Sequence, residues 1–159
     1  MIRSRLRRGR DGSWQLRLPA AERDLLRSLP SQVRQLIAVG DDATRRLFPP
    51  AYADDPVGEA EYRQMVGNSI LASHTEALRI MESTVDAEVL DDTELNAWLG
   101  ALNDLRLVIG TRLDVDEGFA PLPPGDPLAP AMATYSYLSA LQEQVVIALT
   151  SALEGPSSK

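Results

Sequence analysis

The chain has no cysteine and a single histidine among its 159 residues. Without thiols it can form neither disulfides nor cysteine-ligated zinc or iron–sulfur sites, and it has no thiol nucleophile or thiol redox switch. Because His74 is the lone histidine, a metal site with several histidine ligands is impossible. A Ser-His-Asp triad would have only one candidate base.

Signals for membranes, export and catalysis are missing as well. No apolar run approaches the ~18 residues of a membrane span, and no apolar segment follows the arginine-rich N-terminus, which predicts a cytoplasmic protein. The acidic clusters at residues 54–55, 91–92 and 114–117 lack calcium-loop spacing, and phosphate loops, nucleophile elbows and paired-carboxylate motifs are absent. We therefore expect a non-enzymatic protein with no metal and no cofactor.

Lysine is nearly absent, since arginine supplies all but one of the 16 basic residues. Residues 1–46 hold 11 arginines against five acidic residues, whereas residues 47–159 carry a net charge of −13. The chain thus has an arginine-rich end and an acidic remainder. The overall charge of −7 disfavours general nucleic-acid binding, although one basic edge remains.

The hydrophobic pattern predicts a mainly α protein, a helical bundle with a short N-terminal β-hairpin, forming a single domain over residues 1–155. Alternating residues around Gly9-Arg10-Asp11-Gly12 place the hairpin within residues 1–18, and strand is expected nowhere else. Because Pro30 should break a helix, short helices are expected over 19–47. Longer periodic stretches predict helices at 57–85, 91–114 and 128–153. The proline-rich stretch at 115–127 predicts a linker, and residues 156–159 are expected to form a tail.

The clearest helical period runs from Leu95 to Leu113, with apolar residues at spacings of three and four. It predicts that four side chains are buried: Trp98, Leu102, Leu105 and Ile109. Small residues flank a leucine on the opposite face of the same helix: Gly100, Asn103, Leu107 and Gly110. We expect a second helix to pack closely there, with the seam of a homodimer as the alternative.

Three stretches resemble a known family: residues 45–52 (RRLFPPAY), 61–63 (EYR) and 98–113 (WLGALNDLRLVIGTRL). They are similar to actinobacterial proteins catalogued as a domain of unknown function, often encoded near the ClpS protease adaptor, which include AosR-like oxidative-stress regulators. The resemblance spans nearly the whole chain and implies a non-enzymatic, regulatory role in transcription through a protein partner, such as a sigma factor or another transcription component. The redox branch of this family relies on a cysteine pair that is absent here.

The hairpin arginines Arg3, Arg5, Arg7, Arg8 and Arg10 are the candidate interaction residues. Their charges are compatible with a solvated sheet edge that resists aggregation, or with docking of an acidic partner or of an acidic surface on a second copy. Direct DNA binding by the arginine-rich ribbon is the alternative function.

Two further groups have structural interpretations. Arg106 and Arg112 flank the apolar stripe of their helix and are expected to join acids such as Asp104 in a structural ion-pair network, because an unpaired buried charge is costly. An anion or partner site is the alternative. His74 lies at the edge of an apolar stripe and is expected to be a hydrogen-bonded core or boundary histidine, since no motif supplies the nucleophile and carboxylate of a catalytic base.

Overall fold

The glycine-containing turn near the N-terminus joins two short strands, as expected. In the computed structural model, which describes residues 3–113, 123 and 125–154, β1 (Leu6–Arg8) pairs antiparallel with β2 (Trp14–Leu16). Gly12 takes the left-handed conformation (φ 85°) that closes the turn. A third strand, β3 (Val89–Leu90), pairs with the other edge of β2, so the expectation that strand is confined to residues 1–18 is wrong. A strand of two residues between long helices is too short to show the alternation by which strands are recognised in a sequence.

Helix α1 (Ala20–Val39) runs through Pro30 without a break. A proline inside a helix costs about 3 kcal/mol, because it removes one hydrogen bond and its ring crowds the preceding turn. Here the cost is offset by burial: Leu26, Pro30, Val33 and Ile37 recur on one face and are all buried. The expected division of residues 19–47 at Pro30 is therefore wrong. The helix ends at Gly40, which takes the left-handed conformation (φ 66°).

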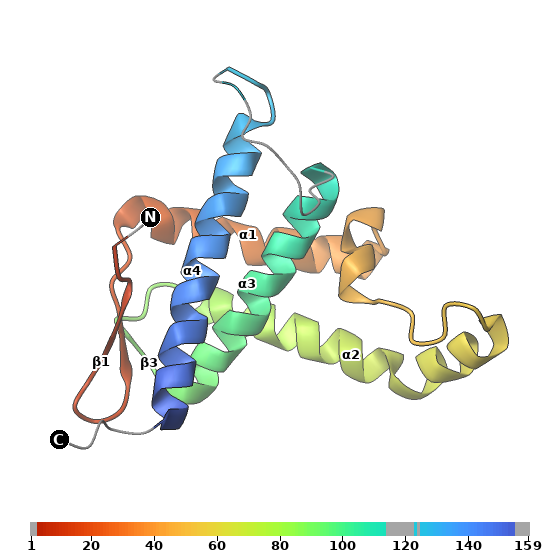
Figure 1. The fold of residues 1–159 in the computed structure, drawn as a ribbon, viewed down its shortest axis with the longest axis horizontal. Coiled ribbons are helices and arrows are strands. Elements are labelled where there is room, and N and C mark those ends of the chain that lie inside the picture. The colour runs from red at the N-terminus through yellow and green to blue at the C-terminus, as the bar shows by residue number, and fades with distance from the viewer. Residues whose placement is uncertain (1–2, 114–122, 124, 155–159) are drawn as a thin grey trace.

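After α1 the chain forms a short 3-10 helix, η1 (Asp42–Leu47), and then the longest helix, α2 (Pro56–Thr84). The side chain of Asp41 accepts a hydrogen bond from the backbone of Ala43 at 2.8 Å, which caps η1. Figure 1 shows the N-terminal half of α2 extending away from the other helices. Its buried residues are accordingly restricted to the C-terminal half.

Helix α3 (Asp92–Leu113) lies at the centre of the molecule, beside α2 and α4 (Ala129–Glu154). Its start is fixed by a capping box in which Asp91 and Glu94 each accept a backbone hydrogen bond from the other. Both glycines of α3 permit close packing, Gly100 beside Ala77 of α2 and Gly110 beside Tyr135 of α4. The prediction that α3 is covered on two sides is confirmed.

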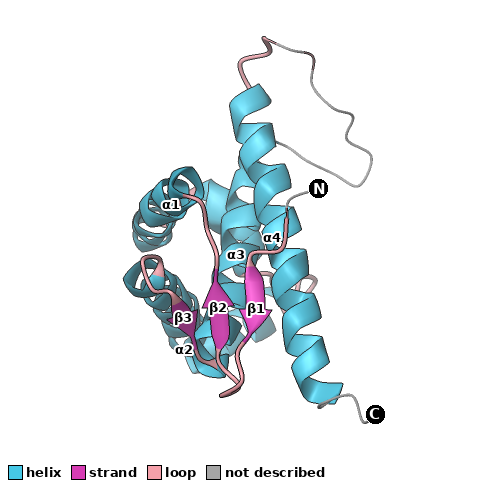
Figure 2. Cartoon of the chain, turned by 90° about the vertical axis from the view of Figure 1, so that its left-hand side faces the viewer, coloured by secondary structure: helices cyan, strands magenta, loops and turns pink. Residues whose placement is uncertain are grey.

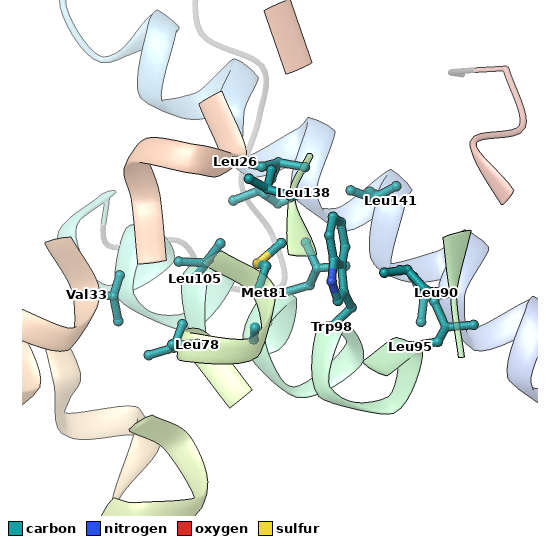
Figure 3. Packing of buried hydrophobic residues seen from close by; sticks show 14 of the residues in the cluster. Leu26, Val33, Leu78, Met81, Leu90, Leu95, Trp98, Leu105, Leu138 and Leu141 are labelled. Carbon is teal, nitrogen blue, oxygen red and sulfur yellow. The ribbon is translucent and has the colours of Figure 1, made fainter. Parts of the chain in front are cut away.

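The buried apolar side chains form one core cluster around Trp98, shown in Figure 3. Trp98, Leu102 and Leu105 are buried as predicted, but Ile109 is only partly buried and Val108 is buried in its place. The buried face of α3 includes Val108 because neighbouring elements cover this helix over a wider arc than the spacing of its apolar residues indicated. The indole nitrogen of Trp98 donates a hydrogen bond of 2.7 Å to Thr84 Oγ1, which satisfies its polar group in the core.

The structure is 73% helical, so the predicted mainly α class with an N-terminal sheet is confirmed. The predicted helices at 57–85, 91–114 and 128–153 agree with α2, α3 and α4 to within a residue at each end. Most of the predicted linker at 115–127, and the tail at 156–159, lie outside the described residues.

Candidate interaction site

Four of the five candidate arginines are exposed to solvent: Arg3, Arg7, Arg8 and Arg10. Arg5 is not, because its Nε and Nη2 donate to the two carboxylate oxygens of Glu22 at 2.9 and 2.7 Å. This pair is largely buried and ties the hairpin to α1, and hydrogen bonding to Arg5 lowers the pKa of Glu22. Arg5 is therefore committed to a contact within the fold, unlike the four exposed arginines.

Arg8 lies over the ring of Trp14, with its guanidinium carbon 5.0 Å from the ring centroid. Trp14 is buried and its indole nitrogen donates to Asp92 Oδ1 at 2.9 Å, which anchors the hairpin at the start of α3. Arg8 therefore covers an apolar surface with its side chain while its charge stays in water, an arrangement that also provides a cation–π contact.

A groove of about 1000 Å³ separates the hairpin from the C-terminal half of α4. Figure 2 shows that β1 is the strand next to this helix. The hairpin side of the groove is formed by Ser4, Leu6, Arg8, Gly9, Arg10, Asp11, Gly12 and Trp14. The helix side is formed by Ala140, Glu143, Gln144, Ile147, Ala148, Ser151 and Ala152. Ile147 is 58% exposed, an unusual exposure for a large apolar side chain inside a groove.

Gln144 closes one end of the groove by bridging α4 to the chain that enters β1. Its Oε1 accepts from the backbone N–H of Arg5 at 2.7 Å, and its Nε2 donates to the carbonyl oxygen of Arg3 at 3.1 Å. Beyond this bridge, toward the turn, hairpin and helix diverge enough to leave the groove. The rim on the hairpin side carries Arg8 and Arg10, so that an apolar floor meets exposed positive charge.

Arg23, which sequence reasoning missed, holds the sheet to the helices. Its guanidinium donates to the carbonyl oxygens of Val85 and Ala87 at 2.6 and 3.2 Å, and to that of Leu16 at 3.2 Å. These carbonyls close α2, precede β3 and end β2. An arginine within an amphipathic helix looks like any solvated charge, so only the tertiary structure reveals this role.

The expected network of Arg106, Arg112 and Asp104 is not formed within the described part of the chain. Arg106 instead bonds Ser139 and Gln142 on α4, and Arg112 is exposed. An arginine on the shoulder of α3 can satisfy its guanidinium with neutral partners because α4 lies close beside it. Asp104 is paired with a different residue, His74.

His74 is a hydrogen-bonded boundary residue, as predicted, and it joins three elements. Its Nδ1 lies 2.7 Å from Asp104 Oδ2 on α3, and its Nε2 lies 3.0 Å from the carbonyl oxygen of Leu47 in η1. Phe48 packs edge-on against the imidazole ring, with centroids 5.3 Å apart. The Asp104 side chain is 3% exposed, and its hydrogen bond raises the pKa of His74. The two residues lie thirty positions apart on different helices, so no local spacing could have paired them.

Within residues 3–113, 123 and 125–154, no three histidine, cysteine, aspartate or glutamate side chains cluster closely enough to hold a metal ion. None of the described helices is long and apolar enough to cross a membrane. The groove between β1 and α4, with its arginine rim, is the candidate interaction site.

These observations define the class of protein as a helical bundle with a groove between its small sheet and its last helix. The sequence profile of the domain of unknown function DUF2017 matches residues 1–149, so the chain belongs to this family. The resemblance seen in the sequence is thereby confirmed.

Relatives with curated names come from mycobacteria. Proteins named "Oxidative stress regulator AosR" from Mycobacterium bovis and Mycobacterium tuberculosis are 34% identical over 128 residues, covering 69% of this chain and 59% of theirs. A protein named "Putative oxidative stress regulator AosR" from Mycobacterium leprae is 30% identical, with 58% of its length covered. The chain thus spans only part of the length of these relatives. No solved structure matches it.

Proposed function

We propose that this chain is a non-enzymatic regulatory module that binds a protein partner in the groove between β1 and α4. The carrying observation is that the groove combines an apolar floor with exposed arginines at its rim. Protein interfaces commonly pair a desolvated apolar centre with a charged rim that steers the encounter. The names of the relatives support a regulatory role.

The partner class that fits is an acidic protein surface. The chain divides into an arginine-rich end and an acidic remainder, so long-range attraction favours partners that present acid to the hairpin. Because relatives of the chain are named oxidative stress regulators, we propose a role in regulation of the stress response. The proposed partner is a component of the transcription machinery, such as a sigma factor. A homodimer in which one copy presents its acidic surface to the other is a competing outcome of the test.

The test compares two substitutions at neighbouring positions of α4. Ile147 lines the groove, whereas Val146, which is 44% exposed, does not. Ile147→Glu places a charge in the groove and Val146→Glu places the same charge beside it, so both should fold. Immobilised wild type and Val146→Glu are expected to capture the same transcription component from cytosol, less strongly at high salt, and Ile147→Glu is expected to lose it. Equal capture by both variants would contradict the proposal.

Direct DNA binding by the hairpin is tested in parallel with nonspecific duplex DNA at low ionic strength. Phosphate binding by arginines is strongly salt-dependent. A salt-dependent shift of the duplex that persists in Ile147→Glu would replace the protein-partner proposal with the DNA-binding alternative. We expect no shift, because Arg5 is neutralised by Glu22 and the remainder of the chain repels phosphate.

A further inference from the structure

The direction of the backbone groups in β1 follows from the hydrogen bonds on either side of it. The N–H of Arg17 donates to the carbonyl of Arg5 at 2.7 Å, and the N–H of Gly9 donates to the carbonyl of Ser13 at 2.7 Å. In an antiparallel ladder, hydrogen-bonded pairs alternate with pairs whose backbone groups point outward. The odd-numbered residues of β1 therefore face β2, and the even-numbered residues face away from it.

Leu6 and Arg8 thus direct their backbone groups to the open edge of the sheet, which is the edge beside the groove. The opposite strand agrees with this alternation, since Leu16, the register partner of Leu6, donates its N–H outward to Glu88 at 2.8 Å. Ser4 Oγ donates to the carbonyl of Leu6. The N–H of Leu6 and both backbone groups of Arg8 have no hydrogen bond to any described residue.

Gln144 of α4 bonds the segment of chain that enters β1, on the side that faces the groove. Its carboxamide accepts from the N–H of Arg5 and donates to the carbonyl of Arg3, the two groups that flank Ser4. Arg5 directs its carbonyl to Arg17 and its N–H to Gln144, so the regular alternation of β1 does not extend back past Arg5. The open edge therefore begins at Leu6, beyond the Gln144 bridge.

The wall opposite β1 has room for a backbone. Where α4 faces the open edge it carries mainly small side chains, Ala140, Ala148, Ser151 and Ala152. Side chains of an added strand would alternate between the groove floor, near Leu6 and Trp14, and solvent. A strand laid between a sheet edge and a helix is a recurring way of recognising peptides, in which main-chain hydrogen bonds supply affinity and pockets supply specificity.

The charges around the edge select the occupant. Arg7, Arg8 and Arg10 are exposed here, against Glu143 on α4 and Asp11, whose carboxylate is engaged by the backbone and hydroxyl of Ser13. A second copy adding its own β1 would bring arginines opposite arginines, which is unfavourable for directly facing cross-strand pairs. An extended segment with acidic side chains meets no such repulsion from the arginines.

We propose that β1 binds an extended, acidic segment of a partner protein as an added strand, in the groove beside α4. This inference rests on the proposed function and specifies how the partner is recognised. It predicts that recognition depends on the backbone N–H and C=O groups of the bound segment. A helix docked in the same groove would instead be recognised by its side chains.

The probe is a capped hexapeptide of alternating glutamate and valine, titrated to millimolar concentration into the 15N-labelled full chain. The Leu6 and Arg8 amide signals are expected to shift, and their hydrogen exchange is expected to slow. A lysine–valine hexapeptide of the same length is the matched control and should leave both amides unchanged. Absence of any change with the glutamate peptide, or equal changes with both peptides, would overturn the inference.

Two further comparisons separate this inference from the proposed function. N-methylation of the peptide backbone at alternate residues, and Ile147→Glu, should each weaken binding by roughly tenfold or more, whereas Val146→Glu should not. If the acidic peptide loses binding with Ile147→Glu but tolerates N-methylation, the groove binds a partner and strand addition is wrong. If the labelled chain instead forms a dimer that protects Leu6 and Arg8, a second copy is the occupant and the inference fails.

Discussion

Raising the pH should weaken the junction of η1, α2 and α3, because His74 faces a hydrogen-bond acceptor with each ring nitrogen. Asp104 Oδ2 lies 2.7 Å from Nδ1 and the carbonyl oxygen of Leu47 lies 3.0 Å from Nε2. Only the imidazolium can donate to both. Deprotonation removes one of these bonds and directs a ring lone pair at an oxygen.

The sign and size of the effect follow from linkage. The hydrogen bond to Asp104 raises the pKa of His74 above its ordinary 6.5, so the folded state holds this proton more tightly than the unfolded chain. The stabilisation is complete below pH 6.5 and is lost as the pH rises through the folded-state pKa. Each unit of pKa elevation contributes about 1.4 kcal/mol. Burial also raises the pKa of Asp104, which acts in the same direction from its own ordinary value upward.

The assay compares the wild type with the double substitution His74→Gln and Asp104→Asn, which keeps two polar side chains and removes both titrating groups. Urea unfolding at several pH values from 5.5 to 9, roughly spanning the titration, should show the wild type losing stability relative to the double variant. Because His74 is the chain's single histidine, one imidazole NMR signal reports its pKa directly. Parallel pH profiles, or a histidine pKa at or below 6.5, would refute the reasoning.

Other predictions concern folding and oxidation. Arg5→Ala should lower the free energy of unfolding by about 1.5–3 kcal/mol, as expected for charged hydrogen bonds, whereas Arg7→Ala should change it by less than about 0.5 kcal/mol; matched thermal melts test this. Gly110→Ala should be less stable than Gly100→Ala, because the added methyl meets a tyrosine ring at 3.1 Å in the first and a methyl group at 3.7 Å in the second. Mild peroxide should oxidise Met65, which is 82% exposed, without changing the oligomeric state, as mass spectrometry and size-exclusion chromatography can show.

The helices were predictable because the helical spacing of apolar residues is a local pattern in the sequence. α3 and α4 carry apolar side chains at spacings of three and four over several turns, and their ends agree with the prediction. Two errors have a common cause in tertiary structure. Pro30 is tolerated because it is itself a buried residue of the α1 face, and β3 exists because β2 offers it an edge. Neither compensation is visible in the local sequence.

The candidate site was predictable only in part. Alternation located the hairpin and its arginines, but it could not separate Arg5, which is committed to Glu22, from Arg8 and Arg10 at the groove rim. The other wall of the groove comes from α4, more than a hundred residues later in the chain. Long-range pairs of this kind depend on how helices pack, and single-sequence periodicity has no information about that.

This chain has the fold of its family but no cysteine, so its fold does not depend on thiol chemistry. Its relatives are named for oxidative stress, yet Trp98, Trp14 and the capping box of α3 build the core and anchor the hairpin without any thiol. The groove beside β1 is likewise lined by residues that peroxide does not readily oxidise, apart from Trp14. An oxidant response that passes through residues 1–159 therefore cannot use a thiol of their own, and methionines such as the exposed Met65 are the readily oxidised side chains that they offer.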